Sequence, residues 1–429
     1  MRARNWDPFP VPPDSIDAIL LTHAHLDHCG WLPKLYTEGF RGKIYSTAAT
    51  AEIAKIVLLD SAHIQEEDAF YKRKRHKKEG RKAKYPEVPL YTQEDAQACS
   101  THFSTVKYTK PKQITNGITA TFHNAGHILG ASMIKVEVGL NGQARTIIFS
   151  GDVGQWDVPI LRDPTIFEQA DYVLTESTYG DRLHPDTNNV KELLAEVVNS
   201  TSEKGGNIVI PSFALERSQE VLYRLNELLL EKKIPQLPVF MDSPMAINVT
   251  EVFEKHSELF DEDMVEFIRN HESPFDFPGL SMTRATSESK EIKHQKGPCI
   301  IIAGSGMCTG GRVKHHLVAN ISRPESTVLF VGYQAIGTLG RIIIEGADPV
   351  RILGKKYAVR ARIAQIQGFS AHADRDELLK WITGLKDPPR HIFAVHGEPE
   401  TIASFAGFLK DKTGWPVTAP NYLDEVTLD

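Results

Sequence analysis

The feature that most constrains the fold is a repeated pattern in which an apolar β-strand ends in a side chain able to bind a metal or carry a proton. The largely apolar run 16–22 is typical of a buried strand. Similar runs are expected at 118–122, 133–138, 145–150, 172–175, 361–367 and 392–395. The polar residues that follow these strands are His23, His25, Asp27, His28, His127, Asp152, Glu176, His372 and His396. We therefore expect strand ends from distant parts of the chain to meet at one site.

The first of these clusters is the segment His23-Ala24-His25-Leu26-Asp27-His28. His23 and His25 are two residues apart, so in an extended segment they project to the same side and can chelate one ion. Asp27 and His28 lie where the chain turns toward the helix expected at 31–37, and they face a neighbouring position. Packing alone rarely places four such side chains within six residues. Imidazoles with carboxylates suit Zn²⁺, with Mn²⁺ as the alternative.

Two adjacent divalent ions need more ligands than this cluster supplies, and His127, Asp152 and His396 are the candidates to complete the set. Asp152 is suited to bridge because its two oxygens can bind different ions. An ion pair suits phosphodiester hydrolysis, in which a metal-bridged hydroxide attacks and the ions neutralise charge on the phosphate. The leaving alkoxide then needs a proton. His372 is a candidate for this general acid, oriented and kept cationic by a carboxylate such as that of Glu176.

A different pattern of predicted secondary structure between about 181 and 346 indicates a second domain. Helical patterns at 190–201 and 216–232 alternate with strands at 207–211, 238–242, 299–303 and 327–331. This alternation predicts a parallel sheet with flanking helices. A Gly-rich turn at 304–312 follows a strand there. Its backbone N–H groups could hold phosphate, or its glycines could serve only a tight strand–helix connection, and both readings stay open.

Composition excludes several classes. The chain has 429 residues, 41% of them hydrophobic and 24% charged, which is ordinary for a folded protein of more than one domain. No apolar run reaches the length of a bilayer span, and the start (Met1 to Pro8) has no apolar signal core. The four cysteines are scattered. We expect a cytoplasmic protein with no membrane segment.

Charge is unevenly distributed. Residues 72–84 (KRKRHKKEGRKAK) hold nine Lys or Arg and one Glu, so the net charge of −6 is +8 in this run and −14 elsewhere. Such a run makes one surface attractive to a phosphate backbone. A solvated helix face or a loop without function explains it equally well at this stage.

Together these motifs resemble the metallo-β-lactamase superfamily, and within it the β-CASP nucleases that process RNA. The matching elements are the HxHxDH box at 23–28, His127, the SGD box ending at Asp152, Glu176 in ESTYGD, His372 in GFSAHAD and His396 in AVHGE. The DSPMA segment at 242–246 and the Gly-rich turn fall in the inserted part. The resemblance covers nearly the whole chain.

The resemblance implies an α/β fold, an αββα sandwich interrupted by a β-CASP domain with a parallel sheet. The expected ranges are 1–180 and 347–429 for the sandwich and 181–346 for the insertion. One metal would take His23, His25 and His127; the other would take Asp27, His28 and His396; Asp152 would bridge them. His372, Glu176 and Asp27 would be catalytic. Candidate substrate contacts are Ser370, Gly304, Ser305 and Gly306.

A histidine at the last motif, His396, is typical of the RNA-directed branch. The expected function is a two-zinc endoribonuclease acting on single-stranded RNA, with exonuclease activity also expected and a homodimer as one expected assembly. The chain ends 33 residues after His396, and it is most similar to compact bacterial relatives of the eukaryotic mRNA 3′-end cleavage endonuclease. A hydrolase of a small ester, thioester or phosphodiester is the first alternative, and a non-catalytic RNA-binding relative is the second.

The sequence departs from the family at its start. Family members normally have β-strands before the HxHxDH strand, whereas only 22 residues, rich in proline, precede His23 here. We expect the chain to lack those first strands, which would expose a sheet edge and weaken the support of the metal site.

Overall fold

The computed structural model describes residues 4–140, 143–184, 189–271 and 273–429. The first three residues, part of the start in which we expect no signal core, lie outside the described residues. Contacts divide the chain into two compact units. The first unit contains residues up to 157, 163–182 and 372–429, and the second contains 158–162 and 183–371.

The first unit contains two β-sheets. The smaller is parallel, in the order β1 (Ala18–Leu20), β2 (Lys43–Ser46), β3 (Phe103–Thr105). The larger has seven strands in the order β18 (Val417–Thr418), β17 (His391–Ala394), β8 (Tyr172–Thr175), β7 (Gln143–Phe149), β6 (Ser132–Leu140), β5 (Ile118–Asn124), β4 (Lys112–Thr115). In the smaller sheet, β1 is an edge strand.

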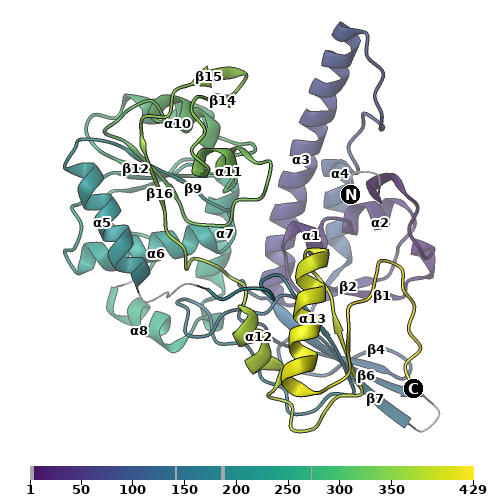
Figure 1. Cartoon of the computed structure of the whole chain (residues 1–429). Helices are drawn as coiled ribbons and strands as arrows, with labels where there is room; N and C mark the ends of the chain where they lie inside the picture. The colour runs from purple at the N-terminus through teal and green to yellow at the C-terminus, as the bar shows by residue number, and fades with distance from the viewer. Residues whose placement is uncertain (1–3, 141–142, 185–188, 272) are drawn as a thin grey trace. The chain divides into compact units, whose positions relative to one another are not determined.

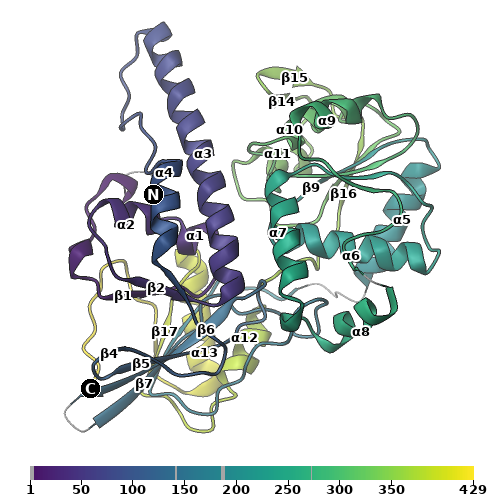
Figure 2. The ribbon, with the colours of Figure 1, turned by 180° about the vertical axis from the view of Figure 1, so that it is seen from behind.

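The two sheets pack face to face and helices cover their outer faces. Ala120, Phe122 and Ile134 of the large sheet are buried against Leu20 and Tyr45 of the small sheet. The helices of this unit are α1 (Leu26–Cys29), α2 (Leu32–Thr37), α3 (Ala48–Glu79), α4 (Gln93–Cys99), α12 (Arg375–Ile382) and α13 (Pro399–Thr413). α3 contacts β3, and α13 contacts β17 and β18 on the other side (Figures 1 and 2). This is the predicted αββα arrangement.

Strand direction explains why the site forms where it does. β5 and β7 are both antiparallel to β6, and β7, β8 and β17 pair in parallel. These four strands therefore run in one direction, and their carboxyl ends meet at one edge of the sheet. The loops that follow them carry His127, Asp152, Glu176 and His396.

The second unit is a parallel α/β domain, as predicted. Its sheet has the order β11 (Leu280–Met282), β10 (Val239–Met241), β12 (Ile300–Ala303), β9 (Ile208–Pro211), β13 (Thr327–Phe330), β16 (Arg362–Gln365), with every pair parallel. Its helices are α5 (Val190–Ser202), α6 (Arg217–Leu230), α7 (Pro244–Lys255), α8 (Glu262–His271), α9 (Thr286–Glu291), α10 (Val313–Asn320) and α11 (Leu339–Ile344). A hairpin of β14 (Val350–Ile352) and β15 (Lys355–Tyr357) completes it.

The expected boundary between the inserted domain and the return segment is residue 346. β16 pairs with β13, so residues up to 371 lie with the second unit. An apolar strand shows in the sequence, but the sheet that it joins depends on partners that the local pattern does not specify. The domain boundaries of 180 and 346 remain a prediction.

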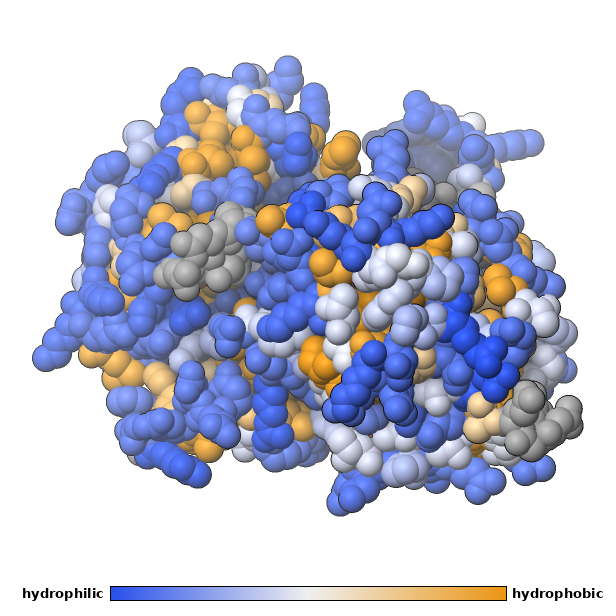
Figure 3. All heavy atoms as spheres, turned by 60° about the horizontal axis from the view of Figure 1, so that its bottom comes forward, coloured by the Kyte–Doolittle hydropathy of each residue, from blue (hydrophilic) through white to orange (hydrophobic). Residues whose placement is uncertain are grey.

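No helix among the described residues is long and apolar enough to cross a bilayer. On the face seen in Figure 3, hydrophilic residues predominate and apolar side chains occur in small groups.

Candidate metal centre

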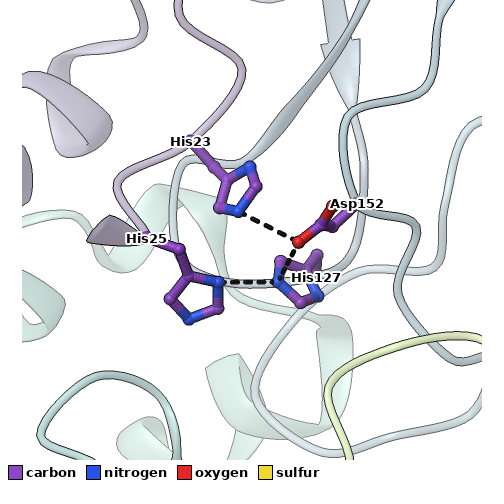
Figure 4. A group of neighbouring side chains, drawn as sticks. All are labelled: His23, His25, His127 and Asp152. Atoms are coloured by element: carbon purple, nitrogen blue, oxygen red, sulfur yellow. Dashed lines mark hydrogen bonds and ion pairs between the residues drawn. The ribbon is translucent and has the colours of Figure 1, made fainter. Parts of the chain in front are cut away.

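Four side chains of the first unit converge in the buried half of the site (Figure 4). His23 and His25 come from the loop after β1, His127 from the loop after β5, and Asp152 from the loop after β7. His23 Nε2 lies 3.2 Å from Asp152 Oδ2, and His127 Nε2 lies 3.5 Å from the same oxygen. His25 Nδ1 is 3.1 Å from His127 Nε2. One ligand atom from each of the four lies within 4.8 Å of the others.

A second group, Asp27, His28 and His396, lies on the other side of Asp152 and is more exposed. Its two imidazoles face the other carboxylate oxygen: His28 Nε2 is 3.4 Å and His396 Nε2 is 3.5 Å from Asp152 Oδ1. Asp27 Oδ2 is 3.9 Å from His28 Nε2 and 3.8 Å from His396 Nε2. Asp152 therefore presents one oxygen to each group.

Several of these nitrogen and oxygen atoms make no hydrogen bond with one another, although they lie close together. The Nε2 atoms of His23 and His28 and Oδ1 of Asp152 are buried without a hydrogen bond among the described residues. Buried polar atoms are normally hydrogen-bonded, so nitrogens and oxygens that lack such partners and face a common centre fit a bound positive ion. Together with the fold, they indicate a divalent metal.

The electrostatics keep the buried half of the site in its metal-binding form. Burial lowers the pKa of His23 and lowers the pKa values of His25 and His127 well below the usual range, so these imidazoles are neutral. A neutral imidazole offers the lone pair that a metal binds. Burial would raise the pKa of Asp152, but the adjacent imidazoles, His23 first, hold it well below its usual range.

A third group joins Asp152 to Glu176 and His372. Glu176 is fully buried and follows β8, and its Oε2 accepts a hydrogen bond from His372 Nδ1 at 3.1 Å. Burial opposes the charged form of His372, but the charge and hydrogen bond of Glu176, together with the charges of Asp152 and Asp27, outweigh it and raise the pKa to about 9. His372 is therefore held as an imidazolium whose Nε2–H is not committed to Glu176.

Backbone contacts fix the loops of the site. Gly154 N–H donates to the Ala125 carbonyl at 2.8 Å, and a Cβ at Gly154 would lie 1.8 Å from the Gly126 oxygen, so only glycine fits. Ala373 N–H donates to the Val153 carbonyl at 2.7 Å, tying the His372 segment to the Asp152 loop. His396 has φ of 51°, a conformation that non-glycine residues rarely adopt and that strained functional positions favour.

The remaining candidate residues lie in the second unit. Ser305 Oγ accepts hydrogen bonds from the backbone of Thr309 at 3.0 Å and Gly310 at 3.3 Å, so this side chain stabilises the Gly-rich turn itself. A Cβ at Gly306 would lie 2.8 Å from the ring of Phe213. Ser370 is half-buried, two residues before His372. Substrate binding by Gly304, Ser305, Gly306 and Ser370 remains a prediction.

Three supporting residues were not found from the sequence. Thr22 Oγ1 lies 3.1 Å from His23 Nδ1, which turns the other nitrogen of this ring toward Asp152. Ser150 Oγ accepts the backbone N–H of Glu176 at 2.9 Å. The ring of Tyr179 lies 5.9 Å from that of His372. All three adjoin motifs already singled out, and that proximity was the available signal.

Comparison with protein families agrees with this geometry. A metallo-beta-lactamase superfamily domain matches residues 8–169, a Beta-Casp domain matches 218–343, and a Zn-dependent metallo-hydrolase RNA specificity domain matches 356–420.

Individual relatives point the same way. The chain is 38% identical over 408 residues to ribonuclease TTHA0252 of Thermus thermophilus, covering 95% of this chain and 87% of the relative. It is 31% identical over 399 residues to an RNase J-like protein of Methanocaldococcus jannaschii, covering 92% and 85%. It is also 31% identical over 423 residues to transcription termination factor FttA of the same organism, where it covers 96% of this chain but only 63% of that protein.

The fold, the strand-edge site and these matches define a metal-dependent hydrolase that acts on RNA. The chain belongs to the β-CASP family of metallo-β-lactamase-fold RNA nucleases.

Proposed function

We propose that the protein is a two-zinc endoribonuclease that cleaves single-stranded RNA. The observation that carries the proposal is the orientation of Asp152, whose Oδ2 faces His23 and His127 while Oδ1 faces His28 and His396. One ion bound beside one of these oxygens would leave the nitrogens that face the other oxygen without a metal. Two separate nitrogen groups on its two oxygens support a pair of ions.

The donor set supports zinc. In the proposed assignment, His23, His25 and His127 hold one ion, and Asp27, His28 and His396 hold the other. Imidazole-rich sites suit Zn²⁺, while the two aspartates keep Mn²⁺ as an alternative. When bound, a pair of divalent ions supplies a water of lowered pKa and positive charge for the attacked phosphate.

The chain's own residues complete the reaction. Hydrolysis forms a bond from water oxygen to phosphorus and breaks the bond from phosphorus to a ribose oxygen, which leaves as an alkoxide. Glu176 fixes His372 through Nδ1 and keeps it cationic. The proposed role of His372 is to give its Nε2 proton to the leaving oxygen.

The small-substrate alternative is disfavoured by the extent of the matches. The chain carries a Beta-Casp domain and an RNA specificity domain in addition to the metallo-β-lactamase domain. A cytoplasmic location, a homodimer and additional exonuclease activity remain predictions.

The test is to incubate zinc-loaded protein with circular single-stranded RNA, with linear RNA labelled at either end, and with DNA of the same sequence. We expect the circle to be opened and internal fragments to appear from linear RNA, with DNA cut far more slowly. The matched control is His372→Ala, which removes the proton donor but no proposed ligand. An intact circle beside a digested linear RNA would make the enzyme an exonuclease. No RNA cleavage by metal-loaded protein would refute the proposal.

A further inference from the structure

The second half of α3 projects from the first unit as an exposed arm, which we define as residues 70–84. Ala69 is the last buried residue of the helix, and every later residue of α3 is exposed except the half-buried His76. Both ribbon views show this end of α3 extending past the other helices of its unit (Figures 1 and 2). The arm contributes little to the packed core, so core packing does not determine which residues occupy it.

The arm has a defined structure that specific contacts hold in place. α3 ends at Glu79, and Gly80 caps it in the left-handed conformation at φ of 63°. The returning segment is then tied to the helix: Leu90 N–H donates to Gln65 Oε1 at 3.0 Å, and Tyr91 Oη–H donates to Ser61 Oγ at 3.0 Å. The ion pair between His76 and Glu87 adds a contact near the tip. Most of the basic run is therefore helical, which leaves open whether it binds a phosphate backbone or is a solvated helix face.

The positive charge of the arm is largely unpaired. Among the described residues, only two of its nine Lys and Arg side chains form an ion pair, Lys72 with Asp68 at 3.5 Å and Arg81 with Glu79 at 3.4 Å. The preceding acidic residues have other partners: Glu66 accepts from Gln93, and Glu67 pairs with His63. The seven cations without an ion pair in the described chain are Arg73, Lys74, Arg75, Lys77, Lys78, Lys82 and Lys84.

These cations surround the helix instead of lining one side. At 3.6 residues per turn, positions 72–75, 77 and 78 cover the full circumference. Arg73 with Lys77, and Lys74 with Lys78, are like charges four residues apart, a spacing that destabilises a helix. The helix dipole offsets this only in the last turn. A helix with this charge distribution is complementary to an external polyanion.

Two exposed aromatic side chains stand at the base of the basic stretch. Phe70 is 54% exposed and Tyr71 is 61% exposed. Cations that follow a backbone, combined with aromatic rings on which bases stack, are the usual means of holding single-stranded nucleic acid. An acidic protein surface would be attracted by the charge but would not explain the rings.

We infer that the arm binds a distal part of the single-stranded RNA substrate, with its cations on phosphates and Phe70 and Tyr71 against bases; this rests on the proposed function. The start of α3 is anchored beside the metal site, because the hydroxyls of Thr47 and Thr50 both donate to the carbonyl of Gly130, in the loop that carries His127. At 1.5 Å per residue, positions 72–78 lie about 36–45 Å along the helix from Ala48.

This distance makes the inference testable by substrate length. At about 3.4 Å per nucleotide of stacked strand, about 12 nucleotides are needed to reach from the metal site to the arm. The arm variant is Arg73→Gln, Lys74→Gln, Lys77→Gln, Lys78→Gln, which keeps good helix formers. The matched control replaces by glutamine four exposed lysines of the same unit that have no ion pair among the described residues: Lys43, Lys107, Lys110 and Lys410.

Metal-loaded proteins are compared on RNAs of about six and about 30 nucleotides, by fluorescence anisotropy and by cleavage kinetics. For the long RNA, the arm variant should bind about tenfold more weakly and show a higher KM with unchanged kcat. The slope of log affinity against log salt should fall by about 3, since four phosphate contacts are lost. The short RNA should be cut as by wild type. Phe70→Ala with Tyr71→Ala should weaken long-RNA binding severalfold without changing the salt slope.

Two results would overturn the inference. One is long-RNA binding and KM that do not change in the arm variant. The other is an equal loss in the lysine control, which would show a general charge effect; circular dichroism of both variants checks that α3 is intact. Failure of the proposed function would look different, because wild-type protein would then cut neither RNA while its affinity for the long RNA still reports on the arm.

Discussion

The two halves of the metal site are built differently although they share Asp152. In the first half, His23 and His127 are almost fully buried, and burial lowers the pKa values of all three imidazoles. In the second half, the Asp27 side chain is 65% exposed and the His396 side chain is 34% exposed. On the proposed two-ion assignment, the difference predicts a division of roles: the buried half would anchor one ion in a rigid frame, and the exposed half would hold the ion that a phosphate can reach.

The strongest test removes what the halves share. Asp152→Asn keeps the size of the side chain but removes the charge that faces both groups. We expect loss of both ions and a fall in RNA cleavage of more than about a thousandfold, roughly 4 kcal/mol of barrier. Metal content by plasma emission spectroscopy and single-turnover cleavage measure the two effects. Retention of two ions per chain would contradict the shared role of Asp152.

The next test separates chemistry from metal binding. His372→Ala should retain both ions and lose cleavage by roughly a hundred- to ten-thousandfold, the range for a general acid. Glu176→Gln should give a smaller loss, because the imidazole stays in place but loses the carboxylate that keeps it charged. If His372→Ala loses metal instead, the role assigned to this histidine is wrong.

The contrast between the halves is sharpened by comparing His127→Ala with His396→Ala. Each should leave about one ion per chain and reduce cleavage by roughly a hundredfold. Only His127→Ala empties a buried position, so only this variant should lower the Tm by roughly 5 °C. Metal-free samples of both variants serve as controls for the contribution of the ion. Equal losses of stability would remove the distinction drawn between the halves.

The smallest expected effect concerns the support of a ligand. Thr22→Val removes the hydroxyl beside His23 Nδ1 and keeps the shape of the side chain. Affinity for the ion proposed at His23, His25 and His127 should fall by about tenfold, the lower end for groups that orient a metal ligand. Competition with a zinc chelator measures it, and Thr37→Val, whose hydroxyl donates to the backbone carbonyl of Lys34 and to no proposed ligand, is the matched control.

Much of this arrangement could be predicted because it depends on short local sequence patterns. The strand at 172–175 and the polar residue after it were located by a short apolar run, and the candidate ligands by residue type at strand ends. Other features depend on distant partners. The strand expected at 16–22 is regular only over Ala18–Leu20, since the backbone must leave the sheet early to present His23. Likewise, β16 joins β13 through pairing that no local pattern encodes.

The central claim is that the carboxylate of Asp152 lies between two metal ions. Anomalous diffraction from crystals of the zinc-loaded protein, recorded on both sides of the zinc absorption edge, locates the ions directly. We predict two anomalous peaks in the first unit, one beside Oδ2 among His23, His25 and His127, and one beside Oδ1 among Asp27, His28 and His396. A single peak, or peaks away from Asp152, would contradict the account.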